Sequence, residues 1–289
     1  MSLTQFRNSL ASILANPHIN RRRGVAKHLH WQYRKALNLF PFEQTLSTSR
    51  IIAHHKRCGV SALIYSQGLY DYNNMNLLRM LLREGGVFFD VGANIGSYAL
   101  VASESKAALV FAFEPHPRTF EFLKTNVELN HRSNVRLFNV ALGAEPSRVL
   151  FTNEEGGATN HIEAIGTPGA ISVPCARAES VCAGYDVAPT IAKIDVEGFE
   201  YDVLAGFGGY LKSLDMVMIE TNGLSDARSK GQEEIQRLLR RNGFHGPFSC
   251  DFDSRTLSRR RFSVEDSLYC SESFLETIVQ TGLTLEDSA

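Results

Sequence analysis

The chain has 289 residues, of which 44% are hydrophobic and 21% charged, with a formal net charge of −1; this composition predicts one main soluble domain with an appendage. No apolar run reaches the roughly 18 to 20 residues that a membrane-spanning helix needs, which argues against a transmembrane protein. The five cysteines show no CxxC spacing, so we expect neither a disulfide framework nor a zinc site, and a reducing, cytoplasmic location.

Residues 1–70 are predicted to form a basic, mainly helical N-terminal extension. Residues 1–60 carry ten Lys and Arg residues and one acid, Glu43, which gives this stretch a net charge of +9. Apolar residues recur at helical spacing from Leu3 to Leu14, and we favour a docked helix over a transit peptide. A solvated face packed on an acidic domain is the favoured interpretation, and contact with an anionic membrane or an acidic substrate is the alternative. Nucleic acid is not expected as a partner.

The main domain is predicted to span residues 71–275, with a C-terminal tail at 276–289. Its first half alternates regularly between helices and strands, expected as a helix at 74–84, a strand at 87–91, a helix at 97–105, a strand at 109–113, a helix at 117–130 and a strand at 135–140. Such alternation is typical of a Rossmann-like, doubly wound α/β fold with a mostly parallel sheet. Ligands of this fold bind at the carboxyl ends of the strands.

The second half contains an irregular hairpin insertion, expected near residues 148–177 and marked by glycine and proline pairs. The alternation then resumes with a strand at 190–194, a helix at 201–211, a strand at 216–219 and a helix at 233–242. Residues 244–252 and 267–270 are candidates for the last strands.

The turn after the first strand reads Asp90-Val-Gly92-Ala-Asn94-Ile-Gly96. Its glycines permit a tight turn and a close approach by a ligand to the start of the next helix. A dinucleotide-binding loop would read GxGxxG, but Asn94 replaces its middle glycine, and Asp90 disfavours a pyrophosphate. The same acid favours a cationic ligand, and S-adenosylmethionine carries both an ammonium and a sulfonium group.

Two further segments are candidates for the same ligand. Glu114 ends the second strand, where a carboxylate can accept hydrogen bonds from ribose hydroxyls, although dinucleotide enzymes place an acid similarly. Ala141 lies in the stretch 139–143 after the third strand, where an adenine ring could be sandwiched; an ordinary core strand is an equally good interpretation.

A charged cluster, Lys193-Ile-Asp195-Val-Glu197, ends the fourth regular strand. In strand geometry these three charged side chains share one face, so they should perturb one another's protonation, as functional groups do. A structural network that caps the next helix is the alternative. Glu220 and Asn222 follow the neighbouring strand and are expected close to Asp195.

A Mg²⁺ ion held by these oxygens is one way to activate a substrate hydroxyl, but we expect no obligatory metal. A carboxylate or Lys193 would then accept the proton. His116 and His161 are weaker candidates for a base, because an isolated histidine is more often structural.

Together, the DVGANIG, AFEP and KIDVEG segments resemble the FkbM family of methyltransferases, with a match from about residue 86 to 222. The resemblance implies a Rossmann-like fold and S-adenosylmethionine as methyl donor. It also implies cofactor contacts at Asp90, Gly92, Asn94, Gly96 and Glu114, and catalytic or acceptor-positioning roles at Lys193, Asp195, Glu197 and Glu220.

The function expected from these observations is methyl transfer to a hydroxyl oxygen of a sugar, glycan or polyketide-like compound. A nucleotide-dependent oxidoreductase and a noncatalytic binding module with the same fold are the alternatives. The acceptor is expected to be a small molecule or a glycan, and the sequence leaves open whether the chain forms a homodimer.

Overall fold

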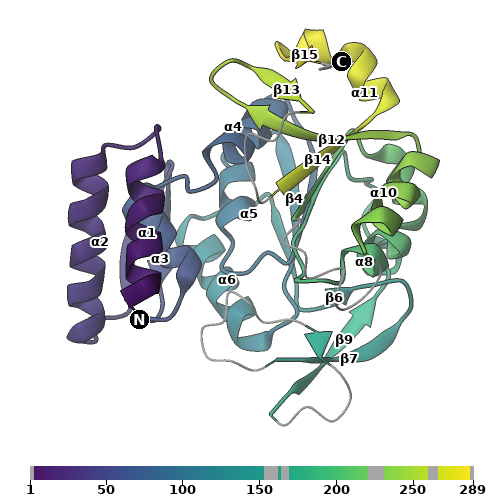
Figure 1. The fold of residues 1–289 in the computed structure, drawn as a ribbon. Coiled ribbons are helices and arrows are strands. Elements are labelled where there is room, and N and C mark those ends of the chain that lie inside the picture. The colour runs from purple at the N-terminus through teal and green to yellow at the C-terminus, as the bar shows by residue number, and fades with distance from the viewer. Residues whose placement is uncertain (1–2, 153–161, 164–168, 221–230, 260–265, 287–289) are drawn as a thin grey trace.

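The computed structural model describes residues 3–152, 162–163, 169–220, 231–259 and 266–286, and shows a large twisted sheet between two layers of helices (Figure 1). Among these residues the sheet has nine strands in the order β15-β13-β12-β14-β11-β10-β3-β4-β5. Its parallel part consists of β11 (Met216–Glu220), β10 (Ile191–Ile194), β3 (Gly86–Val91), β4 (Ala108–Phe113) and β5 (Val135–Phe138). This arrangement confirms the predicted Rossmann-like α/β fold.

The parallel strands are apolar on both faces because helices cover both. Phe88 of β3 packs into one buried cluster, and its neighbour Phe89 packs into the other. The first cluster lies under α4 (Tyr72–Leu81), α5 (Ser97–Ala102) and α6 (Pro117–Leu129). The second lies under α7 (Ala178–Cys182), α8 (Glu200–Gly206), η1 (Gly208–Ser213) and α10 (Gln232–Arg241).

The expected third strand is shorter than predicted, because residues 139 and 140 lie outside any strand. Strand β5 ends at Phe138, and a second sheet of order β6-β9-β7-β8 begins at Ala141. The bounds of its strands are β6 (Ala141–Leu142), β7 (Ser147–Phe151), β8 (Ile162–Glu163) and β9 (Ile171–Ala176). Strands β7 and β9 pair antiparallel, in the region where the sequence predicts an irregular hairpin. The chain leaves the main sheet because Asn139 turns back to donate to the carbonyl oxygens of Glu114 and Pro115.

The C-terminal end of the chain completes the sheet with antiparallel strands. Strands β12 (Phe244–Asp251) and β14 (Asp266–Ser271) occupy the two segments that the sequence offers as last strands. The stretch expected as a tail at 276–289 includes η2 (Ile278–Thr281) and β15 (Thr284–Glu286), which follow α11 (Glu272–Thr277). Strand β15 pairs in parallel with β13 (Thr256–Ser258).

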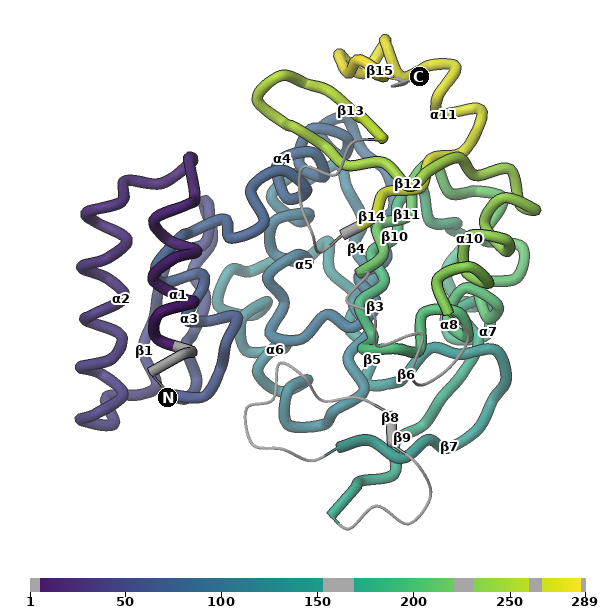
Figure 2. Tube along the Cα trace, in the orientation of Figure 1, coloured from purple at the N-terminus to yellow at the C-terminus, as the bar shows by residue number. Residues whose placement is uncertain are grey.

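Among its described residues the N-terminal arm contains three helices and a β-hairpin, so it is mainly helical, as predicted. Helices α1 (Leu3–Ala15) and α2 (Arg21–Ala36) stand at the edge of the molecule, as the tube in Figure 2 shows. Strands β1 (Phe42–Leu46) and β2 (Ser49–Ala53) form the hairpin, and α3 (Gly59–Gln67) follows. Within the described residues, no helix combines the length and the apolar character needed to cross a bilayer.

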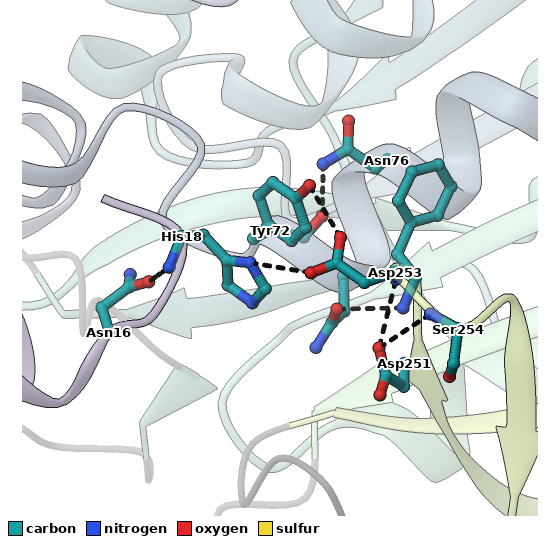
Figure 3. A network of polar contacts seen from close by, with 9 residues as sticks. Asn16, His18, Tyr72, Asn76, Asp251, Asp253 and Ser254 are labelled. Carbon is teal, nitrogen blue, oxygen red and sulfur yellow. Dashed lines mark hydrogen bonds and ion pairs between the residues drawn. The ribbon is translucent and has the colours of Figure 1, made fainter. Parts of the chain in front are cut away.

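A polar network joins the arm to the C-terminal strands (Figure 3). The His18 ring stacks on Tyr72 with ring centres 3.8 Å apart, and its Nδ1 lies 3.5 Å from a carboxylate oxygen of Asp253. The Tyr72 hydroxyl donates to the same carboxylate at 3.0 Å. His18 and Asp253, which are 235 positions apart in the chain, are thereby held together beside the start of α4.

Candidate active site

The parallel register brings the predicted site residues together at one edge of the sheet. Asp90 lies beside Lys193 across β3 and β10, and Ile194 lies beside Ile219 across β10 and β11. Asp195, which directly follows β10, and Glu220, the last residue of β11, therefore lie at adjacent strand ends. They line a pocket of about 280 Å³ together with the other predicted residues Gly92, Asn94, Glu114, Ala141 and Glu197. Gly96 does not line this pocket, but it begins helix α5 as its N-cap.

The glycine turn is held tightly against two neighbouring strands. The amide groups of Gly92 and Ala93 both donate to the carbonyl oxygen of Phe113 at 3.0 Å. Gly92 has φ +83°, and a Cβ atom there would overlap the carbonyl oxygen of Asp195. Only glycine fits this position, because the backbone just after β10 passes directly over it.

Asp90 is a buried acid with an unused oxygen. It is 1% exposed, and its Oδ2 has no hydrogen-bond partner among the described residues. Burial raises the pKa of Asp90 to about 7, an effect reinforced by Asp195 and opposed by the Lys193 ammonium. A buried, half-ionised carboxylate that faces a pocket is satisfied by a cationic ligand, which fits the ammonium or sulfonium of S-adenosylmethionine.

Glu114 anchors the loop and lines the same pocket. One carboxylate oxygen accepts from the Asn94 amide and the other from the His116 amide, each at 2.9 Å. Burial raises the pKa of Glu114 to about 7 despite these two bonds. Each oxygen keeps a second lone pair, so the carboxylate can still accept from ribose hydroxyls.

Lys193, Asp195 and Glu220 form a compact cluster of ionisable side chains that lines the pocket. Lys193 is 6% exposed, and its Nζ lies 2.6 Å from Asp195 Oδ2. Burial alone would raise the pKa of Asp195, but the Lys193 ammonium and hydrogen bonds from Glu220 and Lys193 together hold it below its usual value. For Glu220, burial, its hydrogen bond to Asp195 and that residue's charge raise the pKa to about 10. These opposite shifts favour an ionised Asp195 beside a Glu220 that retains its proton.

Glu197 leaves the strand in a left-handed conformation with φ +52°. The prediction that Lys193, Asp195 and Glu197 alternate along one strand face is wrong in this detail, because β10 ends at Ile194. Carboxylate oxygens of Asp195, Glu197 and Glu220 nevertheless lie within 4.8 Å of one another. Such oxygens could hold a divalent cation if Glu220 lost its proton.

Two tyrosines that sequence reasoning missed, Tyr98 and Tyr70, lie beside the cluster. The Tyr98 ring lies beneath Lys193, with Nζ 4.8 Å from the ring centre, and the Tyr98 hydroxyl donates to Asp71. Tyr70 lines the pocket, and its hydroxyl lies 3.0 Å from that of Ser97. The sequence gives little indication of this role for Tyr70, because it is the last residue of the predicted arm and its neighbour Asp71 is the first residue of the predicted main domain.

The arm also reaches the pocket directly. Val60 and Leu63 of α3 line it, although the sequence predicts residues 1–70 as a separate extension. Asn126 fixes the arm's hairpin to the glycine loop: its side chain accepts from the Ile52 amide and donates to the Ile95 carbonyl, both at 2.8 Å. This fully buried asparagine therefore connects three segments.

The histidines proposed as alternative bases divide into two cases. His116 is the N-cap of α6, where its ring nitrogen accepts from the Thr119 amide, and it is 5% exposed. This geometry favours a structural role. His161, like Asn222 beyond Glu220, lies outside the described residues.

A family model for the methyltransferase FkbM domain matches residues 90–245, more than half of the chain. The matched stretch begins at Asp90 and includes every predicted site residue. The chain belongs to the FkbM methyltransferase family. It is therefore a methyltransferase with S-adenosylmethionine as donor, and this assignment replaces the oxidoreductase alternative. The buried Asp90 oxygen and the glycine turn fit this donor.

Two curated relatives of this FkbM-family protein share about a third of its residues over the aligned region. Hexuronic acid methyltransferase AglP of Haloferax volcanii is 29% identical over 187 residues, which cover 58% of this chain and 74% of AglP. The 31-O-demethyl-FK506 methyltransferase FkbM of Streptomyces tacrolimicus is 30% identical over 197 residues, covering 56% and 74% of the two chains.

Solved structures resemble the FkbM-family protein more remotely. The structure of M. jannaschii TYW2 in complex with AdoMet aligns with 80% of this chain and 86% of its own, at 14% identity and a TM-score of 0.41. Similarity at this level carries no argument about substrate, and the strand order of the sheet is the stronger evidence for the fold.

Proposed function

We propose that the protein methylates a hydroxyl oxygen of a sugar, glycan or polyketide-like acceptor. The observation that carries the proposal is the Lys193–Asp195–Glu220 cluster, which lines the same pocket as Asp90 and Glu114. Support for the acceptor class comes from the two relatives, whose names specify a hexuronic acid and a demethylated FK506.

In this proposal, Asp90, the turn from Gly92 to Gly96 and Glu114 hold the donor, and Ala141 contacts its adenine. S-adenosylmethionine supplies, when bound, an electrophilic methyl group on a sulfonium. Val60, Leu63 and Phe151 line the same pocket and offer apolar contacts to the acceptor. Confining donor and acceptor in one small pocket supplies part of the rate acceleration, because the reacting groups need not find each other in solution.

Asp195 is the proposed proton acceptor. The acceptor hydroxyl becomes strongly acidic as its oxygen gains the methyl group, so even a carboxylate with a lowered pKa can take the proton. Lys193 keeps Asp195 ionised, and protonated Glu220 donates to it and fixes its orientation. Glu197, which has a carboxylate oxygen within 4.8 Å of oxygens of Asp195 and Glu220, is proposed to position the acceptor.

The proposal requires no metal ion, because Asp195 alone can accept the proton of the acceptor hydroxyl. Extensive dialysis against EDTA should leave turnover unchanged. Loss of activity that returns on addition of Mg²⁺ would instead assign a cation to Asp195, Glu197 and Glu220.

The experiment that tests the function is transfer of a labelled methyl group from S-adenosylmethionine to candidate uronic acids, neutral sugars and demethylated polyketides, with products analysed by mass spectrometry. Treatment of the product with mild alkali distinguishes a methyl ester, which hydrolyses, from a methyl ether, which survives. Asp195→Asn should abolish product while it retains donor binding. A methyl ester, or methylation at nitrogen or carbon, would refute the proposal.

A further inference from the structure

The outer face of helix α2 is apolar and exposed to solvent. Leu29, Tyr33 and Leu37 are 53%, 56% and 54% exposed. They follow one another at intervals of four residues, so they form one line along the helix. The inner face of α2 instead buries Gly24, His28 and Trp31. Leu29, Tyr33 and Leu37 are called the α2 stripe below.

Large apolar side chains are concentrated on this arm to a degree that the rest of the described surface does not match. Eight large hydrophobic residues of the described chain are exposed, and five of them lie between residues 14 and 39. These five are Leu14, Leu29, Tyr33, Leu37 and Leu39. Exposed apolar clusters of this kind usually mark a surface that a partner covers.

The charge of the arm identifies the partner's chemistry. Residues 1–42 contain seven Lys and Arg residues and no acid. Three of them, Arg21 to Arg23, are exposed in the first turn of α2, which holds no acidic residue. Cations at a helix N-terminus oppose the helix dipole, so their placement does not stabilise α2. Among the described residues, no ion pair involves these three arginines.

Arg22 also continues the line of the α2 stripe. It lies four residues before Ala26, which lies three residues before Leu29, and residues at these intervals share one helix face. The helix is the outermost element on its side of the molecule (Figure 1). An exposed apolar stripe with arginines at one end matches the interface of a bilayer, where apolar side chains enter the acyl boundary and cations meet anionic headgroups. A symmetric contact between two copies would instead place two strongly basic arms against each other.

We propose that α2 is a docking surface for an anionic lipid bilayer. The α2 stripe enters the interface, and Arg21, Arg22 and Arg23 contact the headgroups. Helix α3 of the same arm contributes Val60 and Leu63 to the pocket lining. Docking through α2 would therefore place the pocket close to the membrane surface. The proposed partner of the α2 stripe is the lipid surface, and the alternative that the experiment must exclude is contact with a second copy of the chain.

The experiment is cosedimentation of the full chain with vesicles of phosphatidylcholine alone or with 30 to 40% phosphatidylglycerol (about the anionic content that gives a strong surface potential). Binding is expected to the anionic vesicles, to fall steeply in high salt, and to drop about tenfold or more in Arg21→Gln/Arg22→Gln/Arg23→Gln. A matched control changes three exposed cations elsewhere, Lys124→Gln/Arg240→Gln/Arg241→Gln, and should bind as the unmodified chain does.

The apolar part is tested by Leu29→Gln/Tyr33→Gln/Leu37→Gln, with Val279→Gln as control because Val279 is 77% exposed on η2. The triple variant should lose binding while its thermal midpoint and S-adenosylmethionine affinity stay unchanged. Equal binding to neutral vesicles, or no binding to either composition, would overturn the proposal. So would a stable dimer in analytical ultracentrifugation that the stripe variant dissociates, because the stripe would then be covered by a second copy.

Discussion

Lys193 and Asp195 form an ion pair of 2.6 Å in which the lysine is almost completely buried. The pair sits where β10 ends, beside Asp90 of β3 and Glu220 of β11. Removal of one member leaves the other as an uncompensated charge in a poorly solvated site. The catalytic proposal and the stability of the pocket therefore depend on the same contact.

The first prediction separates chemistry from donor binding at this pair. Asp195→Asn removes the proposed proton acceptor but preserves the shape of the side chain, so kcat should fall by about two to four orders of magnitude. The donor's Kd, measured by calorimetry, should change little. A kcat within threefold of the unmodified enzyme's would show that Asp195 is not the base, and Glu197→Gln would then be the next variant to test.

The second prediction concerns pH and Asp90. The folded pKa of about 7 lies above the ordinary value of this group, so the folded protein holds an extra proton between about pH 4 and 7. The stability of the ligand-free protein should therefore decrease as pH rises through this window. Affinity for cationic S-adenosylmethionine should change in the opposite direction, because the ligand prefers ionised Asp90.

Calorimetry from pH 5.5 to 7 should show the Kd for S-adenosylmethionine falling by about tenfold. Glu114 has a similarly raised pKa, so Asp90→Asn should make the pH dependence shallower and the double variant Asp90→Asn/Glu114→Gln should remove it. A steep dependence that persists in the double variant would place the titrating group elsewhere.

The third prediction tests the close approach at Gly92. Because a Cβ atom would overlap the Asp195 carbonyl and φ is +83°, Gly92→Ala should destabilise the fold by about 1 to 3 kcal/mol and impair donor binding. Gly68→Ala is a matched control, since it also has positive φ but no atom within 4 Å of the added Cβ. Equal losses of donor affinity in the two variants, measured by calorimetry, would contradict the special role of Gly92.

The fourth prediction assigns Tyr98 a positioning role that acts through Lys193. Tyr98→Leu removes the ring beneath the ammonium, whereas Tyr98→Phe keeps the ring and loses the hydroxyl that donates to Asp71. Activity should fall more in the leucine variant, and the acid limb of its pH–kcat profile should move upward, because a displaced Lys193 would no longer hold the pKa of Asp195 down. Indistinguishable pH profiles in the two variants would argue for a purely structural tyrosine.

The fifth prediction concerns the attachment of the arm by Asn126. Asn126→Ala leaves the half-buried Ile52 amide and the buried Ile95 carbonyl without their partner, which should lower the free energy of unfolding by about 2 to 4 kcal/mol. Asn242→Ala, which loses one half-buried bond to Leu238, should cost about 1 kcal/mol or less. Urea titration measures both, and similar costs would show that Asn126 is not a special connection.

The sequence by itself determined the main features of the fold and the donor side of the site. Continuous apolar runs such as residues 87–91 predict buried parallel strands because helices cover both faces, and parallel strands present their carboxyl ends on one edge. Asp90, Glu114 and Asp195 could therefore be grouped before any coordinates existed. The glycine turn was equally readable, because its φ angles depend on local chemistry.

Only the tertiary structure decided which residues far apart in the chain complete the pocket. Tyr98 meets Lys193 and Asp71, and Asn126 meets Ile52, through contacts that span up to 95 residues and leave no periodic signal. The protonation of Glu220 is likewise a property of its burial beside Asp195, since a carboxyl group's pKa depends on its surroundings. Local patterns encode turns and strands, whereas long-range packing sets the charges and the walls of the site.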